Sequence, residues 1–150
     1  MEVTVLNRQR AHRVSAARLA DFVEGLSRTL PADGADSVAI KLVSDRKMRE
    51  YNRTFRGRDG TTDVLSFPAE PDTQPPGERH LGDIVISVTT AAAQARRARR
   101  GLSGELCVLA LHGYLHLLGY DHETDDGTMM RLQRRLERRL LGPAPPRRSS

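Results

Sequence analysis

The sequence has almost no cysteine and no long apolar run, and each absence excludes a class of protein. Among its 150 residues Cys107 is the one cysteine, so the chain forms no internal disulfide. It lies in the apolar stretch 106–111, where we expect a small core residue and not a nucleophile or ligand. No apolar run approaches the roughly 20 residues of a membrane-spanning helix. The first seven residues also lack the basic and apolar regions of a signal peptide, so we expect a cytoplasmic protein without a membrane partner.

Basic charge, by contrast, is plentiful. The formal net charge is +5 and the sequence pI about 10.1. Nearly all basic residues are arginine, because Lys41 and Lys47 are the only lysines. An arginine-rich surface favours polyanions, since the planar guanidinium suits phosphate. Charge alone leaves two interpretations open: a surface that binds nucleic acid, or an ordinary solvated surface rich in arginine.

Hydrophobic periodicity predicts a single α+β domain over residues 1–141, in which a small mixed four-stranded sheet packs with five helices. We expect strands at 3–6, 37–43, 64–67 and 81–87, and helices at 16–29, 45–52, 88–100, 103–118 and 127–141. The helix at 103–118, with Ser103 as its cap, is apolar on most faces and must therefore be buried. Residues 56–62 and 69–80 are expected to be loops, and 142–150 a disordered tail.

Three of the five histidines, His112, His116 and His122, lie within eleven residues. The first two are spaced i, i+4, so on a helix their side chains lie on the same face. Gly119 can end that helix in a left-handed conformation and return the chain, which lets His122 reach the same point. Three imidazoles with an open fourth position form the ligand set of a catalytic zinc, expected here as one ion at the C-terminal end of a buried central helix. Nickel or copper could occupy the same ligands.

This spacing matches the metzincin protease pattern H-E-x-x-H-x-x-G-x-x-H at its three histidines and its glycine. Gly113, however, stands where those proteases carry the glutamate that acts as general base. No other glutamate is obvious beside the ligands, and both features argue against peptidase chemistry. Asp121 adjoins the third ligand and could either orient an imidazole or cap the turn. His12 and His80 lie in polar segments and are expected at the surface.

Three segments of the chain resemble the YbeY family, the bacterial rRNA maturation factors described as metal-dependent endoribonucleases. They are 52–68 (NRTFRGRDGTTDVLSFP), 81–87 (LGDIVIS) and 112–122 (HGYLHLLGYDH), in the family's order and spacing. The similarity extends over residues 35–141. The third segment is highly specific, whereas the first differs at Gly60-Thr61, where the family commonly has Lys-Pro.

The resemblance implies zinc held by His112, His116 and His122, with Arg56 at the active site. It also implies a single-stranded RNA substrate, and a role in rRNA processing, notably of the 3′ end of the small-subunit 16S rRNA, and in ribosome quality control. The expected partners are rRNA and the ribosome or its small-subunit precursor, with ribosomal or assembly proteins as further candidates. Arg56 would stabilise the negative charge that develops on a phosphodiester during cleavage.

Two other functions stay open at this point: a metallopeptidase that uses the metzincin-like site, or a non-catalytic ribosome assembly factor with a structural zinc. Gly113 opposes the first. The sequence offers only three good zinc ligands, which opposes the second, because structural zinc sites usually have four. Asp63 and Ser66 are expected to hold the strand and loop beside the site. The arginines of 96–100 and 131–139 could widen an RNA-binding surface or form solvated helix faces.

Overall fold

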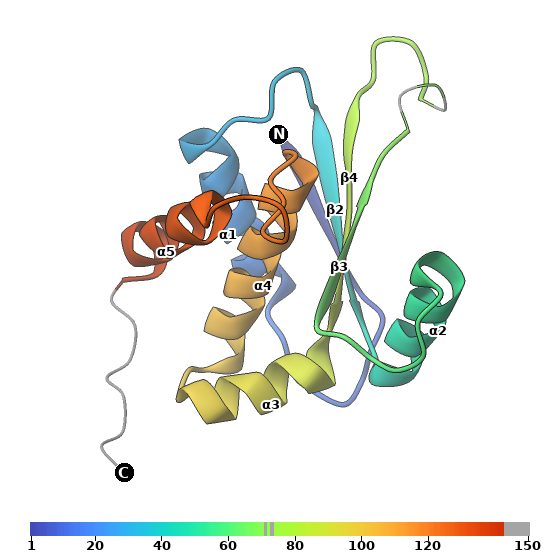
Figure 1. Cartoon of the computed structure of the whole chain (residues 1–150), viewed down its shortest axis with the longest axis vertical. Helices are drawn as coiled ribbons and strands as arrows, with labels where there is room; N and C mark the ends of the chain where they lie inside the picture. Colours follow the sequence, from blue (N-terminus) through green and yellow to red (C-terminus); the bar gives the residue numbers. More distant parts are fainter. Residues whose placement is uncertain (71, 73, 143–150) are drawn as a thin grey trace.

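The computed structural model describes residues 1–70, 72 and 74–142, which form a four-stranded sheet with five helices around it (Figure 1). In chain order the elements are β1 (Glu2–Asn7), α1 (Ala16–Thr29), β2 (Ser37–Val43), α2 (Asp45–Arg56), β3 (Val64–Pro68), β4 (His80–Ser87), α3 (Val88–Ala98), α4 (Leu102–Leu117) and α5 (Thr128–Leu141). The predicted α+β class is confirmed. The tail expected at 142–150 lies, beyond Gly142, outside the described residues.

The sheet is mixed and runs in the order β1-β2-β4-β3. Strands β1, β2 and β4 are parallel, whereas β3 pairs antiparallel with β4 and forms one edge. Side chains alternate between the two faces of a strand, so each face has its own core. The face toward α1 and α4 carries the larger core, which includes Val38, Ile40, Leu42, Ile84 and Ile86. The opposite face carries a smaller one beneath α2, built on Met48 and Val85. Figure 1 accordingly shows α2 on the other side of the sheet from the remaining helices.

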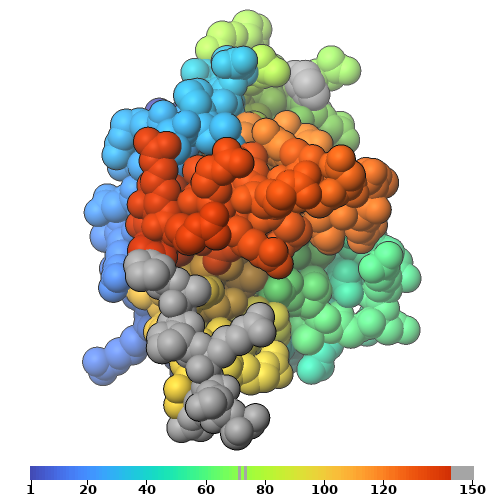
Figure 2. Space-filling view, turned by 60° about the vertical axis from the view of Figure 1, so that its left-hand side comes forward, coloured from blue at the N-terminus to red at the C-terminus, as the bar shows by residue number. Residues whose placement is uncertain are grey.

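Helix α4 is the buried central helix that its apolar sequence predicts. Every residue from 105 to 111 is buried, Cys107 among them, and burial raises the pKa of its thiol to about 11. Helix α5 packs along α4 and forms a continuous band on the outer surface (red in Figure 2). Within the described ranges, no helix combines the length and apolar character that crossing a membrane requires.

Side-chain caps begin two of the helices, at serine residues, which favour this position. The hydroxyl oxygens of Ser15 and Ser44 accept hydrogen bonds from the backbone N–H groups three residues on, each at 3.2 Å. The expected cap at Ser103 is wrong, because α4 begins one residue earlier with Gly101 as its N-cap. The carbonyl of Gly101 already accepts from the backbone N–H of Glu105 at 3.1 Å, so the first helical turn begins there. In the preceding turn Arg99 ends α3 in a left-handed backbone conformation, with φ +57°.

Candidate metal centre

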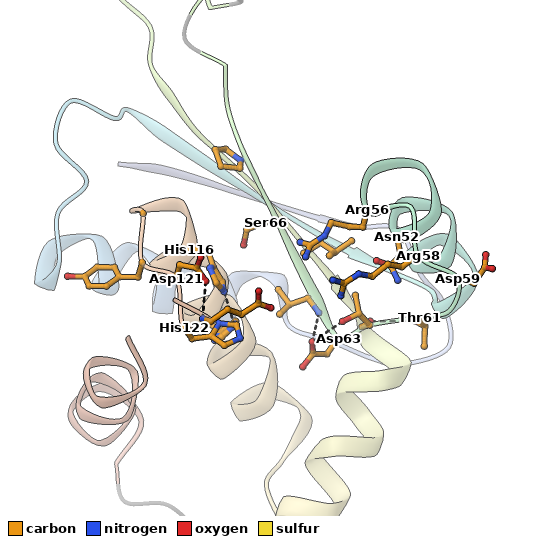
Figure 3. A pocket seen from close by; sticks show the side chains of 18 residues that line it. Asn52, Arg56, Arg58, Asp59, Thr61, Asp63, Ser66, His116, Asp121 and His122 are labelled. Carbon is orange, nitrogen blue, oxygen red and sulfur yellow. Dashed lines mark hydrogen bonds between the residues drawn. The ribbon is translucent and has the colours of Figure 1, made fainter. Parts of the chain in front are cut away.

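The three predicted histidines converge at the end of α4 and in the loop that follows it (Figure 3). One ligating atom from each ring lies within 4.8 Å of the other two. Nε2 of His112 and Nε2 of His116 lie 3.1 Å apart. The rings are tilted with centroids 4.7 to 5.3 Å apart, so they surround a point and do not stack on one another. One metal ion could therefore bind all three imidazoles.

Gly119 brings the third histidine to this point, as the sequence predicts. Its φ is +100°, a conformation that glycine adopts without a steric penalty. The backbone N–H of Gly119 donates to the carbonyl of His116 at 2.9 Å, and that of Tyr120 donates to Leu115 at 3.1 Å. These two bonds form a Schellman motif, which satisfies the last carbonyls of α4 and reverses the chain. His122 then faces the ligands on the helix.

Gln133 of α5 fixes the orientation of the first ligand. Its side-chain oxygen lies 2.7 Å from Nδ1 of His112, and its side-chain nitrogen donates to Glu137 at 3.5 Å. An amide oxygen only accepts, so Nδ1 of His112 carries the proton and Nε2 keeps its lone pair for a metal. Sequence analysis missed Gln133. The sequence did contain a signal, because Gln133 is a polar residue within the apolar stripe of α5, between Met129 and Leu136. In the structure its side chain is 6% exposed.

Burial and crowding favour the neutral form of His116. The pKa of His116 is lowered, first by burial and then by the proximity of His112 and His122. Neutral imidazole is the form that binds a metal ion. Asp121, the candidate for either an orienting or a capping role, accepts a hydrogen bond from the backbone N–H of Glu123 at 3.0 Å, and this bond is the main reason that its pKa is lowered. The structure thus shows Asp121 capping the turn.

The histidines form one wall of an open cavity of about 880 Å³. Arg56, at the end of α2, lines this cavity as predicted, and so does Arg58, which sequence analysis did not single out. Figure 3 shows both arginines extending from the α2 side toward the wall that carries His116 and His122. The other lining residues belong mainly to two segments, 59–68 and 119–123. The cavity therefore combines a candidate metal site with two guanidinium groups.

Buried polar contacts hold the arginine-bearing loop in place. Asn52 is 7% exposed, and its side-chain nitrogen donates to the carbonyl of Gly60 at 3.1 Å. The backbone carbonyl of Asn52 accepts from the N–H of Arg58 at 3.3 Å. Gly57 ends α2 in the left-handed conformation, with φ +64°. These contacts set the position of the backbone that carries Arg56 and Arg58.

Asp63 and Ser66 have the bracing contacts expected of them. One carboxylate oxygen of Asp63 accepts from the backbone N–H of Val64 at 2.8 Å, and the other accepts from the side chain of Gln94 at 3.2 Å. The Ser66 hydroxyl donates to the backbone carbonyl of Gly113 at 3.0 Å, which joins β3 to α4. Both residues also line the cavity.

Gly113 occupies a position where no side chain fits. A Cβ atom there would lie 2.7 Å from Cγ2 of Ile84 and 3.0 Å from the Ser66 hydroxyl. The position at which metzincins carry their glutamate therefore faces the sheet in this chain. A glutamate that the sequence did not make obvious nevertheless lines the cavity: Glu123, which directly follows His122 in the chain. Its place depends on the turn at 119–123, which the ligand spacing alone does not reveal.

The charge around the cavity suits a bound cation. Four carboxylate side chains line it, Asp59, Asp63, Asp121 and Glu123, against two arginines. Together with three converging imidazoles, this donor set fits a divalent metal ion of the kind that prefers nitrogen ligands.

The other basic segments lie elsewhere. Arg99, Arg134 and Arg138 line a separate groove with Arg18, where α3, α4 and α5 meet, and do not reach the histidine cavity. Whether they contact RNA stays a prediction. His80, half-buried at the start of β4, contacts Asp83 at 2.8 Å and lies outside the cavity, as does His12.

Comparisons with known proteins agree with this architecture. The family model of endoribonuclease YbeY matches residues 4–141. The endoribonuclease YbeY of Moorella thermoacetica is 43% identical over 137 residues, covering 85% of this chain and 88% of the relative. That of Thermodesulfovibrio yellowstonii is 33% identical over 159 residues, covering 97% and 99%. For a relative from Anaeromyxobacter sp., 48% identical over 114 residues, the match spans 75% of this chain and 55% of the relative. The solution structure of a Thermotoga maritima protein superposes with a TM-score of 0.63 at 28% identity, covering 93% of this chain and 89% of the other.

Proposed function

Because this chain belongs to the endoribonuclease YbeY family, it is a hydrolase that acts on RNA, and we propose that it cleaves single-stranded RNA with a zinc ion held by its three histidines. One observation carries the proposal. The convergent imidazoles of His112, His116 and His122 line the same cavity as Arg56 and Arg58. Metal ligands and phosphate-binding groups thus face a common space.

His112, His116 and His122 would hold the zinc, one ion per chain. When bound, zinc supplies a Lewis acid for a phosphoryl oxygen and lowers the pKa of a bound water toward about 7. The chain prepares its ligands for this role: Gln133 keeps the proton of His112 on Nδ1, and burial disfavours the protonated form of His116. Three imidazoles with a free position are typical of catalytic zinc, which supports zinc over nickel or copper.

Arg56 and Arg58 would bind the scissile phosphate. In the described part of the chain, neither guanidinium has a side-chain partner, so both are available to an anionic ligand. A guanidinium offers two parallel N–H donors to phosphate, and such bonds strengthen as negative charge develops on its oxygens. Arg56 contributes in this way to the transition state, while Arg58 helps to position the backbone of the substrate.

The cellular role we propose is rRNA processing, with maturation of the 3′ end of the 16S rRNA and ribosome quality control as its particular tasks. The support is the resemblance of segments 52–68, 81–87 and 112–122 to the family of rRNA maturation factors. The ribosome or its small-subunit precursor is then the partner that presents the RNA. The basic net charge of +5 is consistent with such a partner.

Cleavage of an end-labelled single-stranded RNA by purified protein tests the proposal. Wild type should cleave after zinc is added to chelator-treated protein, and Arg56→Ala should lose most of this activity. Arg46→Ala is the matched control, since Arg46 lies at the other end of α2, outside the cavity. Equal losses in both variants, or equal cleavage by wild type and His116→Ala, would contradict the proposal.

One observation favours a second candidate, a metallopeptidase: the carboxylate of Glu123 lines the cavity beside His122. Digestion of a peptide library separates the two functions. Chelator-sensitive peptide products that disappear in Glu123→Gln would support the peptidase. The third candidate, a non-catalytic assembly factor, has no support from the relatives, which are named as endoribonucleases.

A further inference from the structure

The chain contains three phenylalanines and three tyrosines, and three of these six rings meet at one place. Tyr51 and Phe55 of α2 stack with centroids 5.9 Å apart and planes at 26°. Phe67 of β3 approaches Phe55 edge-on, at 5.2 Å and 66°, and lies 5.9 Å from Tyr51. We refer to Tyr51, Phe55 and Phe67 as the aromatic cluster.

Phe55 is the exposed end of this cluster. Its side chain is 60% exposed, the largest value among the exposed large apolar residues of the described chain. Lys47, Tyr51 and Phe55 are spaced by four residues on α2, and the Lys47 ammonium lies 5.6 Å from the Tyr51 centroid. The helix ends at Arg56, so no helical residue follows to cover Phe55 in the same way. The series of stacked side chains on α2 therefore ends in Phe55, whose ring is exposed to solvent.

Two members of the aromatic cluster adjoin residues that line the histidine cavity, although none of the three rings lines it. Phe55 immediately precedes Arg56 in the chain, and Phe67 lies between Ser66 and Pro68. The neighbours Arg56, Ser66 and Pro68 all line the cavity. Because strand residues alternate, Ser66 faces α4 and Phe67 faces α2. Strand β3 is the edge of the sheet. A chain that leaves the cavity across this edge would meet Phe55 directly after Arg56.

We propose that Phe55 stacks on an unpaired RNA base next to the phosphate that Arg56 binds, so that the aromatic cluster is a base-stacking platform of the active site. The inference rests on the proposed cleavage of single-stranded RNA, and names how that substrate is held. Every base offers a π face, so such stacking accepts many sequences and favours unpaired strands. The guanidinium of the exposed Arg53 pairs with Asp59 at 3.6 Å, whereas Arg56 and Arg58 line the cavity without a side-chain partner in the described part of the chain. These two unpaired cations next to Phe55 favour RNA over an apolar protein segment as the occupant.

Binding measurements test the platform separately from cleavage. The probes are a 2′-O-methyl phosphorothioate oligoadenylate, which resists cleavage, and an abasic strand of the same backbone and length, both with zinc-loaded protein. Phe55→Ala and Phe55→Leu should each bind the oligoadenylate roughly tenfold more weakly, as expected for the loss of one stacked base, and the abasic strand unchanged. Phe55→Trp should retain the affinity. Wild-type affinity in Phe55→Leu, or equal weakening of both probes, would overturn the proposal.

The absence of tryptophan from the sequence allows a direct observation of stacking. In Phe55→Trp the single indole should lose fluorescence when the oligoadenylate binds and keep it when the abasic strand binds. Phe22→Trp on α1 is the control and should show no change with either probe. If Phe55→Trp is not quenched although the strand binds and RNA is still cleaved, the platform is wrong and the proposed function stands. If quenching occurs without any cleavage, the platform stands and the proposed function fails.

Discussion

Nδ1 of His112 and the side-chain oxygen of Gln133 lie 2.7 Å apart, and this contact joins a candidate metal ligand on α4 to helix α5. The network continues outward. The side-chain nitrogen of Gln133 donates to Glu137, and Glu137 approaches Arg100 at 3.8 Å. Arg100 in turn pairs with Glu105 at 3.1 Å. A series of polar contacts thus runs from the histidine cavity to the turn between α3 and α4.

The first prediction concerns Gln133. Gln133→Met keeps the volume of the side chain and removes the acceptor, so Nδ1 of His112 loses the partner that fixes its tautomer. We expect zinc affinity, measured by competition with a chelator, to fall roughly 10- to 100-fold, as for other residues that support a metal ligand. Leu132→Met, at the neighbouring position, should leave the affinity unchanged. Equal affinities of Gln133→Met and wild type would show that the contact does not support the site.

A second prediction concerns Gly113. Gly113→Ala places a methyl group 2.7 Å from Ile84, within a packed core, and should lower the free energy of unfolding by about 1–3 kcal/mol. Gly25→Ala makes the same change inside α1, where the nearest atom is 3.8 Å away. It should raise the free energy of unfolding by roughly 0.5–1 kcal/mol, because alanine favours helices. Urea denaturation measures both values, and a stabilised Gly113→Ala would refute the close contact.

Local signals allowed most of the fold to be predicted. Ser15 and Ser44 mark helix starts because their hydroxyls compete for backbone N–H groups nearby, and this chemistry acts within four residues. The start of α4 lies one residue earlier than predicted, at a Gly101 cap without a side-chain hydrogen bond, and it follows a turn in which Arg99 has a positive φ that its residue type rarely adopts. The order of the strands follows from long-range packing, which periodicity does not encode.

The third prediction uses this unusual backbone. Arg99→Gly should raise the free energy of unfolding by about 1 kcal/mol, because a side chain in the left-handed conformation is strained and glycine is not. Gly57→Ala provides the reverse case at φ +64°, with no atom near the added methyl, and should be destabilising by a similar amount. Thermal or urea unfolding measures the change in the free energy of unfolding for both variants. Changes of the same sign in both variants would argue against backbone strain at Arg99.

The fourth prediction concerns pH and Glu105. This carboxyl group is 6% exposed, and burial raises its pKa above the ordinary 4.5, although the charge of Arg100 acts in the opposite direction. A raised pKa in the folded state means that the stability contributed by Glu105 is present below the unfolded value and lost as pH rises through the folded value. Glu105→Gln cannot ionise. Urea denaturation at several pH values measures the free energy of unfolding of both proteins. The value for the variant minus that for wild type should rise with pH above 4.5 and then level off. A constant or falling difference would contradict the raised pKa.

The candidate site divides in the same way into predictable and unpredictable parts. His112, His116, Gly119 and His122 lie close in sequence, and the helix together with the glycine turn that ends it brings the three imidazoles together. Gln133 comes from another helix and Arg58 from a loop held by Asn52, so only the tertiary structure places Gln133 beside His112 and Arg58 in the same cavity. The resemblance to a known family provided Arg56, which its local sequence would not have distinguished from a solvated arginine.

The most direct test of the account is a zinc titration of metal-free protein in which bound metal and cleavage of single-stranded RNA are measured together. We predict that cleavage rises with zinc until one ion is bound per chain, and that His116→Ala neither binds this ion tightly nor cleaves. Full cleavage by metal-free wild type, or undiminished cleavage by His116→Ala, would contradict the assignment of the three histidines as the metal site of this endoribonuclease.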